Sequence, residues 1–187
     1  MTMTPDERME ALLQAEVDGQ LPELLLFWGH HPDPWGGPGP GCLSQWWMAP
    51  FVVDNVRYLT AEHWMMAGKA RLFGDDDSLE AVLAASNPGK AKAIGREVEG
   101  FDEATWARHC YAVVVAGNLA KFRQRSDLRR FLLGTGEQVL VEASPYDRIW
   151  GIGRAATDDD ARWPSQWRGR NLLGFALMDV RDQLAGT

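Results

Sequence analysis

An acid and an amine lie seven residues apart in the segment TAEHWMMAGKARLFGD, residues 60–75. A helix advances about 100° and about 1.5 Å per residue, so Glu62 and Lys69 differ by about 20° in direction and about 10 Å along its axis. Both side chains are long enough to reach one small ligand that lies along the helix. A carboxyl group so placed can move protons while the amine binds or attacks the same molecule.

The same charges also have a purely structural interpretation. The dipole of a helix favours an acid in its first turn and a base in its last turns, and long charged side chains often flank a buried stripe with their heads in water. His63 points away from the Glu62 line, and the segment contains no zinc-binding H-E-x-x-H motif. The expected core stripe is Ala61, Trp64, Met65, Gly68 and Leu72, and the expected second line is Glu62, Met66, Lys69 and Phe73.

Caps, turns and apolar spacing predict the elements that position this helix. The Pro/Gly-rich segment 30–41 reads as a surface loop, residues 147–169 as a long loop rich in Gly and Trp, and 51–58 as a hairpin with Asp54-Asn55 as its turn. The prediction is one mostly helical α+β domain with a few short strands. Helices are expected after the caps Thr4, Thr60, Asn87, Ser126 and Asn171, with further helices from Asp102 to about Phe122 and over 77–85 and a strand over 138–141.

Composition narrows the class of protein. The 187 residues carry a formal charge of −7, which argues against broad, non-specific binding to nucleic acid. The two cysteines cannot form a structural zinc site alone and give no disulfide framework. The charged N-terminus is not a signal peptide, and no run reaches the roughly 18 apolar residues of a membrane span. We expect a cytoplasmic protein that does not contact membranes.

Other motifs are weaker. The glycine-containing loops match neither a P-loop nor a dinucleotide fingerprint, and the aspartate runs 75–77 and 158–160 lack the pattern of a ligand loop, so we expect no metal and no cofactor. Several arginines gather in the late loop, where guanidinium groups could bind phosphate or could simply be solvated. They are Arg148, Arg154, Arg168 and Arg170.

Blocks spread along the chain resemble one known family. The helix TAEHWMMAGKARLFGD resembles the signature helix of the NADAR family, whose name refers to NAD and ADP-ribose and which includes YbiA-like proteins. The order and spacing of further blocks agree with that family from about residue 26 to 184, so we expect a helical extension over 1–25 and a NADAR-like domain over 26–187. The further blocks are LFWG (26–29), LSQWWMAPF (43–51), NLAKF (118–122), residues 128–133, LVEASPYDRIWGIG (140–153) and GRNLLG (169–174).

The resemblance implies an N-glycosidase that releases a ribose from an exocyclic amine. Two substrate classes are associated with the family: guanine bases that carry ADP-ribose, as nucleosides or in nucleic acid, and phosphoribosylamino-pyrimidine intermediates of riboflavin synthesis. The first class makes some members antitoxins or repair enzymes, whose counterpart would be an ADP-ribosyltransferase toxin. The style of the signature helix is closer to the ADP-ribose branch. A non-catalytic reader of ADP-ribose or NAD is the alternative from another class.

The family motif places its catalytic acid and lysine at Glu62 and Lys69. A ribosylamine can open to an imine, which a partly neutral lysine attacks to hold the sugar as a Schiff base. Burial would lower the pKa of such a lysine from about 10.4 towards the useful range. A direct route, in which Glu62 activates water, stays open.

The closing blocks imply a set of substrate-binding residues. Trp150 would stack on the base and Asp147 would bind the sugar hydroxyls or the amine, although a Trp beside a turn can also fill a core gap. Some relatives carry a second acid where this chain has Ile152. The remaining candidates are Ser44 and Gln45 for phosphate or base edges, together with Arg148, Gly151 and Asn171, the last of which can equally be a helix cap.

Overall fold

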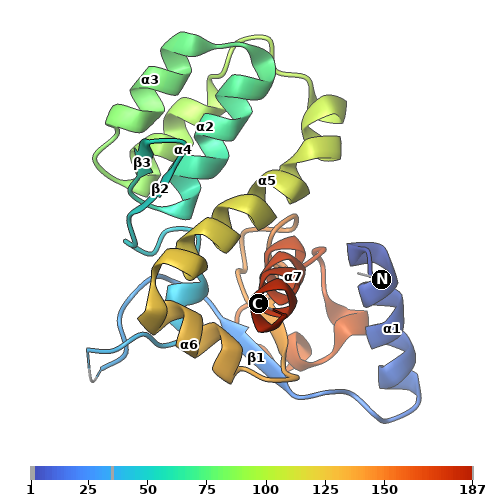
Figure 1. The fold of residues 1–187 in the computed structure, drawn as a ribbon. Helices are drawn as coiled ribbons and strands as arrows, with labels where there is room; N and C mark the ends of the chain where they lie inside the picture. Colours follow the sequence, from blue (N-terminus) through green and yellow to red (C-terminus); the bar gives the residue numbers. More distant parts are fainter. Residues whose placement is uncertain (1–2, 35, 187) are drawn as a thin grey trace. The chain divides into compact units, whose positions relative to one another are not determined.

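The computed structural model describes residues 3–34 and 36–186, and contacts within the chain divide it into two units. Residues 1–44 and 130–187 form one unit, here called the parallel-sheet unit, and residues 45–129 form the other, here called the hairpin unit. Figure 1 shows the helices and strands of both. Among the described residues no helix is long and apolar enough to cross a membrane.

The parallel-sheet unit is built on two strands that are far apart in the sequence. Strand β1 (Leu24–Phe27) pairs with β4 (Val139–Glu142) in parallel, with Leu24 opposite Val139 and Phe27 opposite Glu142. Helix α7 packs on β4, and α1 packs on α7 and on the short helix η3. Besides these strands, the elements of this unit are α1 (Pro5–Val17), η1 (Pro40–Leu43), η2 (Asp159–Arg162), η3 (Pro164–Gln166) and α7 (Leu172–Ala185).

Helix α7 approaches β4 closely because of one glycine. A Cβ at Gly174 would overlap the carbonyl oxygen of Leu140, so only glycine allows this distance between the helix and the strand. Every residue of α7 from Leu172 to Arg181 is buried, which makes this helix the centre of the unit's core.

Helix α1 is tied to the same unit by a nearly buried ion pair. The Arg8 guanidinium lies 2.6 Å from the Asp179 carboxylate of α7, and both side chains are about nine-tenths buried. At the other end of α1, the Glu16 carboxylate accepts hydrogen bonds from the backbone N–H and the hydroxyl of Ser165. The segment predicted as an N-terminal extension therefore packs on the α7 core.

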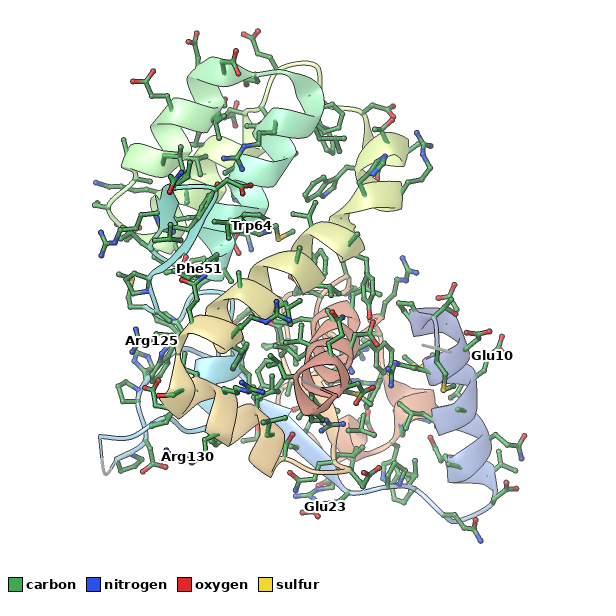
Figure 2. The ribbon with its side chains drawn as sticks, viewed as in Figure 1. Glu10, Glu23, Phe51, Trp64, Arg125 and Arg130 are labelled. Atoms are coloured by element: carbon green, nitrogen blue, oxygen red, sulfur yellow. The ribbon has the colours of Figure 1, made fainter. Side chains whose placement is uncertain are left out.

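The hairpin unit surrounds helix α2 with other elements. Helices α3, α4 and α5 and strand β3 all pack against α2. Phe51, Tyr58 and Trp64 form an aromatic cluster beside it, with ring centroids 5.0 to 6.3 Å apart, and Figure 2 labels two of them. The elements are β2 (Phe51–Val53), β3 (Val56–Tyr58), α2 (Ala61–Phe73), α3 (Asp76–Ala84), α4 (Pro88–Arg96) and α5 (Glu103–Gln124), while α6 (Ser126–Gly134) spans the boundary between the units.

Most predicted helix starts and the predicted hairpin are confirmed. Asp54 and Asn55 both have positive φ, as the two-residue turn of a hairpin requires. The caps accept hydrogen bonds from backbone N–H groups two or three residues into each helix. The confirmed caps are Thr4, with a full capping box, Thr60 and Asn87, and Asp102 caps the long helix that was predicted to start there.

Three local predictions need correction. Helix α3 begins one residue earlier than expected because Asp75 caps it, and β4 begins one residue later. The single buried stripe on α2 is wrong, since Glu62, His63, Met66 and Lys69 are buried as well. Helices α3, α4 and α5 all pack against α2, which explains why its burial extends beyond one stripe, and helical periodicity alone does not reveal these contacts.

Candidate active site

Glu62 and Lys69 both lie on the buried surface of α2. Glu62 is 5% exposed and Lys69 is 8% exposed. Thr60 caps the helix, and the backbone N–H of Glu62 donates to the carbonyl oxygen of Gln45 at 3.0 Å. Glu62 lies in the first turn, where the helix dipole favours a carboxylate. The fold thus takes both chemically active groups largely out of water, as a site for proton and group transfer requires.

The amine of Lys69 contacts a backbone carbonyl group and an aromatic ring, which together are here called its seat. Its Nζ donates to the carbonyl oxygen of Gly95 at 2.6 Å and lies 3.9 Å from the centroid of the Phe101 ring. Gly95 is in the last turn of α4, where carbonyl groups have no partner within the helix. Burial lowers the pKa of Lys69 below its usual range, which increases the neutral, nucleophilic fraction of the amine.

A close approach of two helices creates this seat. A Cβ at Gly95 would overlap the side chain of Met66, so α4 comes nearer to α2 here than any larger residue would permit. Phe101 is on the segment between α4 and α5, and its ring also contacts Phe73 at a centroid distance of 5.4 Å. The sequence reasoning missed both Gly95 and Phe101, because their role depends on contacts between elements.

Gln45 is held beside the first turn of α2 by side-chain and backbone contacts. Its Oε1 accepts from Asn118 Nδ2 at 2.7 Å, and its Nε2 points at the sulfur of Met65 at 3.8 Å. Asn118 is completely buried in the middle of α5. A polar residue at helical spacing from Val114 and Phe122, both buried on α5, is the signal that could have identified it.

His63 has a structural role. Its ring lies between the Thr60 hydroxyl at 2.7 Å and the Ala85 carbonyl oxygen at 3.0 Å, and it is 1% exposed. Burial lowers its pKa, so the neutral ring is favoured. The structure thereby satisfies both ring nitrogens within the fold and leaves proton transfer on α2 to Glu62.

Asp147 and Trp150 belong to one tight turn of the parallel-sheet unit. Asp147 Oδ1 accepts from the backbone N–H groups of Ile149 and Trp150, each at 2.8 Å. Gly151 follows, and a Cβ there would lie 2.9 Å from the carbonyl oxygen of Glu142. Asp147 therefore shapes the turn that presents the half-buried Trp150, and Gly151 allows the turn to approach β4.

Asn171 differs from the predicted helix cap. It precedes α7 with a positive φ of 54°, but its side chain makes no capping hydrogen bond. Instead Oδ1 accepts from the Glu142 N–H and Nδ2 donates to the Leu140 carbonyl oxygen, each at 2.9 Å. The buried side chain thus ties the start of α7 to β4, because the strand's free edge offers both partners.

The remaining predicted residues of this unit are Ser44 and Arg148. Ser44 is buried at the end of η1. Arg148 is exposed, and a Cβ built at Gly153, whose φ is positive, would lie 3.2 Å from its side chain and 3.0 Å from that of Arg168. Trp28 and Tyr146 follow β1 and β4, are 58% and 86% exposed, and lie with ring centroids 6.4 Å apart. Aromatic and cationic groups are thus available on the surface of this unit.

The two units divide the predicted site residues between them. Glu62, Lys69 and Gln45 belong to the hairpin unit. The parallel-sheet unit holds Ser44, Asp147, Arg148, Trp150, Gly151 and Asn171.

Two further features of the described residues concern metal ions and a cavity. Among them no three His, Cys, Asp or Glu side chains are grouped so as to hold a metal ion. A cavity of about 300 Å³ lies in the parallel-sheet unit, and none of the predicted site residues lines it. Its lining is Pro5, Asp6, Met9, Leu13, Pro164, Ser165, Trp167, Gly169 and Arg170.

Comparisons with known proteins agree with the family resemblance. The family model described as the NADAR domain matches residues 26–185. N-glycosidase R617 of Acanthamoeba polyphaga mimivirus is 39% identical over 150 residues, which cover 78% of this chain and 88% of that relative. N-glycosidase YbiA of Escherichia coli (strain K12) is 32% identical over 145 residues, which cover 78% of this chain and 82% of YbiA.

A solved structure agrees as well. The NMR structure of the E. coli protein YbiA superimposes with a TM-score of 0.70 at 29% identity, covering 87% of this chain and 85% of that one. The predicted mostly helical α+β fold is therefore confirmed. The chain belongs to the NADAR family.

Proposed function

We propose that this protein is an N-glycosidase that hydrolyses the bond between a phosphorylated ribose and an exocyclic amine of a nucleobase. The names of its relatives support N-glycosidase activity. The observation that carries the proposal is the seat of Lys69, a buried amine with a lowered pKa on the same helix as the buried Glu62. A protein that only reads its ligand needs neither of these groups.

The covalent route uses both side chains. When the ribosylamine opens, C1 forms an imine with the base amine and the ring oxygen takes a proton. The neutral Lys69 amine adds to C1, and the base amine departs after it accepts a proton, leaving a Schiff base between Lys69 and the sugar. Water then adds to C1 and releases the sugar as an aldehyde. Glu62 supplies and removes the protons in these steps.

The environment of Lys69 supports this role. In a neutral amine, one N–H remains bonded to the Gly95 carbonyl oxygen, so the lone pair is held in another direction and is available for attack. Burial makes the neutral form accessible at a lower pH than for an exposed lysine. The direct route, in which Glu62 activates water, requires no neutral lysine and forms no Schiff base. Reductive trapping of the sugar on Lys69 therefore distinguishes the two routes.

ADP-ribosylated guanine is the substrate that we favour. It contains two bases and a diphosphate, whereas a phosphoribosylamino-pyrimidine contains one base and one phosphate. The helix over residues 60–75 is closer in style to the ADP-ribose branch of the family, and this resemblance supports the larger ligand.

The test is a parallel incubation of the protein with ADP-ribosylated guanosine and with a phosphoribosylamino-pyrimidine, followed by mass spectrometry of the products. We expect release of guanosine and ADP-ribose at the higher kcat/KM. Lys69→Ala should abolish this release, and Lys90→Ala is its control. Lys90 is an exposed residue of α4 of which only the backbone takes part in the helix cap. Tight binding of ADP-ribose without release of either base would instead indicate a non-catalytic reader.

A further inference from the structure

One hydrogen-bonded chain in the hairpin unit fixes the direction of two side-chain amides. The carbonyl oxygen of Val114 can only accept, so the Asn118 atom that faces it at 2.9 Å must be the nitrogen Nδ2. The second hydrogen of this nitrogen points at Gln45, where the partner at 2.7 Å must again be an acceptor, Oε1. The nitrogen of Gln45 is thereby directed to the other side of its amide.

The unpaired atom of Asn118 is consistent with this polarity. Asn118 is completely buried, and its Oδ1 has no hydrogen-bond partner among the described residues. Rotating the amide by 180° would place Oδ1 against two oxygens at once, those of Val114 and Gln45. Leaving one buried acceptor unpaired is less unfavourable than facing two acceptors with a third. The oxygen and nitrogen of the Asn118 side-chain amide therefore cannot exchange places.

The side-chain nitrogen of Gln45 can still donate a hydrogen bond. Its Nε2 carries two hydrogens, and the only partner of this nitrogen in the described part of the chain is the Met65 sulfur, a weak acceptor at 3.8 Å. The backbone of the same residue is bonded to Glu62 N–H at 3.0 Å, which places Gln45 next to the first turn of α2.

We propose that Asn118 is a positioning residue that holds the Gln45 amide with its nitrogen towards the ligand, so that Gln45 binds a hydrogen-bond acceptor of the substrate. This inference rests on the proposed function and on the family resemblance, which implies that Gln45 is a candidate for binding phosphate or base edges. The matching groups on an N-ribosylated base are a ring nitrogen or carbonyl oxygen beside the exocyclic amine. Asn118 itself does not touch the ligand.

Two isosteric substitutions test the polarity. Gln45→Glu retains an acceptor for Asn118 but replaces the donor, and Asn118→Asp removes the donor that holds Gln45 Oε1. Each should lower kcat/KM by about 10- to 100-fold, mainly through KM. In a Gln45→Met background, Asn118→Asp should have almost no further effect. An equal loss in both backgrounds, or wild-type kinetics for Gln45→Glu, would overturn the proposal.

A measurement without substrate separates this proposal from the proposed function. Both side-chain amide hydrogens of Asn118 should exchange with solvent far more slowly than those of Asn55, which is exposed in the β2–β3 turn. Gln45→Met should accelerate exchange of the Asn118 amide. Rapid exchange in the wild-type chain would refute the fixed polarity, whether or not the protein hydrolyses its substrate.

Discussion

At the scale of single residues, Lys69 determines the expected dependence of activity on pH. Burial lowers its pKa, and the nucleophile is the neutral amine, which predominates above that pKa. We therefore expect kcat/KM to rise with pH through the lowered pKa of Lys69 and to level off below the usual range of lysine. A pH–rate profile of the free enzyme measures this directly.

Phe101 should influence the same profile. Its ring covers the amine at 3.9 Å, so Phe101→Ala admits water, raises the pKa of Lys69 towards its ordinary value and moves the rising limb to higher pH. The matched control is Trp163→Ala, which removes an exposed aromatic residue of the parallel-sheet unit. A profile for Phe101→Ala that coincides with the wild type would show that the ring does not control the amine's hydration.

Glu62 is expected to act in proton transfer. Glu62→Gln preserves the shape of the side chain in its buried site but cannot exchange protons, so kcat should fall by about 10²- to 10⁴-fold with little change in KM. The measurement is steady-state kinetics with the better substrate. A loss confined to KM would instead assign Glu62 to substrate binding.

Asn171 should matter for stability. Its two hydrogen bonds to β4 are buried, so Asn171→Ala leaves an N–H and a carbonyl oxygen unpaired and should destabilise the fold by about 2–4 kcal/mol. Chemical denaturation measures the difference. Asn171→Asp, which keeps the acceptor for Glu142 N–H, should lose less, and an unchanged midpoint for Asn171→Ala would contradict the assigned role.

At the scale of elements, the packing of α7 on β4 depends on Gly174. An added methyl group would overlap the Leu140 carbonyl oxygen, which belongs to the backbone and cannot move alone, so Gly174→Ala should cost about 1–3 kcal/mol. Gly134 is the control, because no atom lies within 4 Å of a Cβ built there. Gly134→Ala at the end of α6 should be neutral or slightly stabilising in thermal denaturation.

At the scale of the whole molecule, local signals and long-range contacts differ in what the sequence reveals. Capping residues such as Thr4 and Thr60, and the Asp54-Asn55 turn, specify helix starts and a hairpin through neighbours only a few residues away. The parallel pairing of β1 with β4 joins segments more than 100 residues apart, and neither strand carries a signal that names its partner. This part of the fold could not be predicted from local pattern.

The candidate site shows the same limit. Glu62 and Lys69 were identifiable because helical spacing brings them into one line, and because their segment matches a family motif. The groups that hold Lys69, the Gly95 carbonyl and the Phe101 ring, come from α4 and from the segment after it. Backbone carbonyls carry no sequence signal, so contacts of this kind appear only in the folded chain.

The most direct test of the central claim is chemical trapping of the sugar on Lys69. The protein is mixed with ADP-ribosylated guanosine and sodium borohydride, and the digested chain is examined by mass spectrometry. We predict one reduced ribosyl adduct, on Lys69, which persists in Lys90→Ala and disappears in Lys69→Ala together with turnover. Normal hydrolysis by Lys69→Ala, or an adduct on another lysine, would contradict the account.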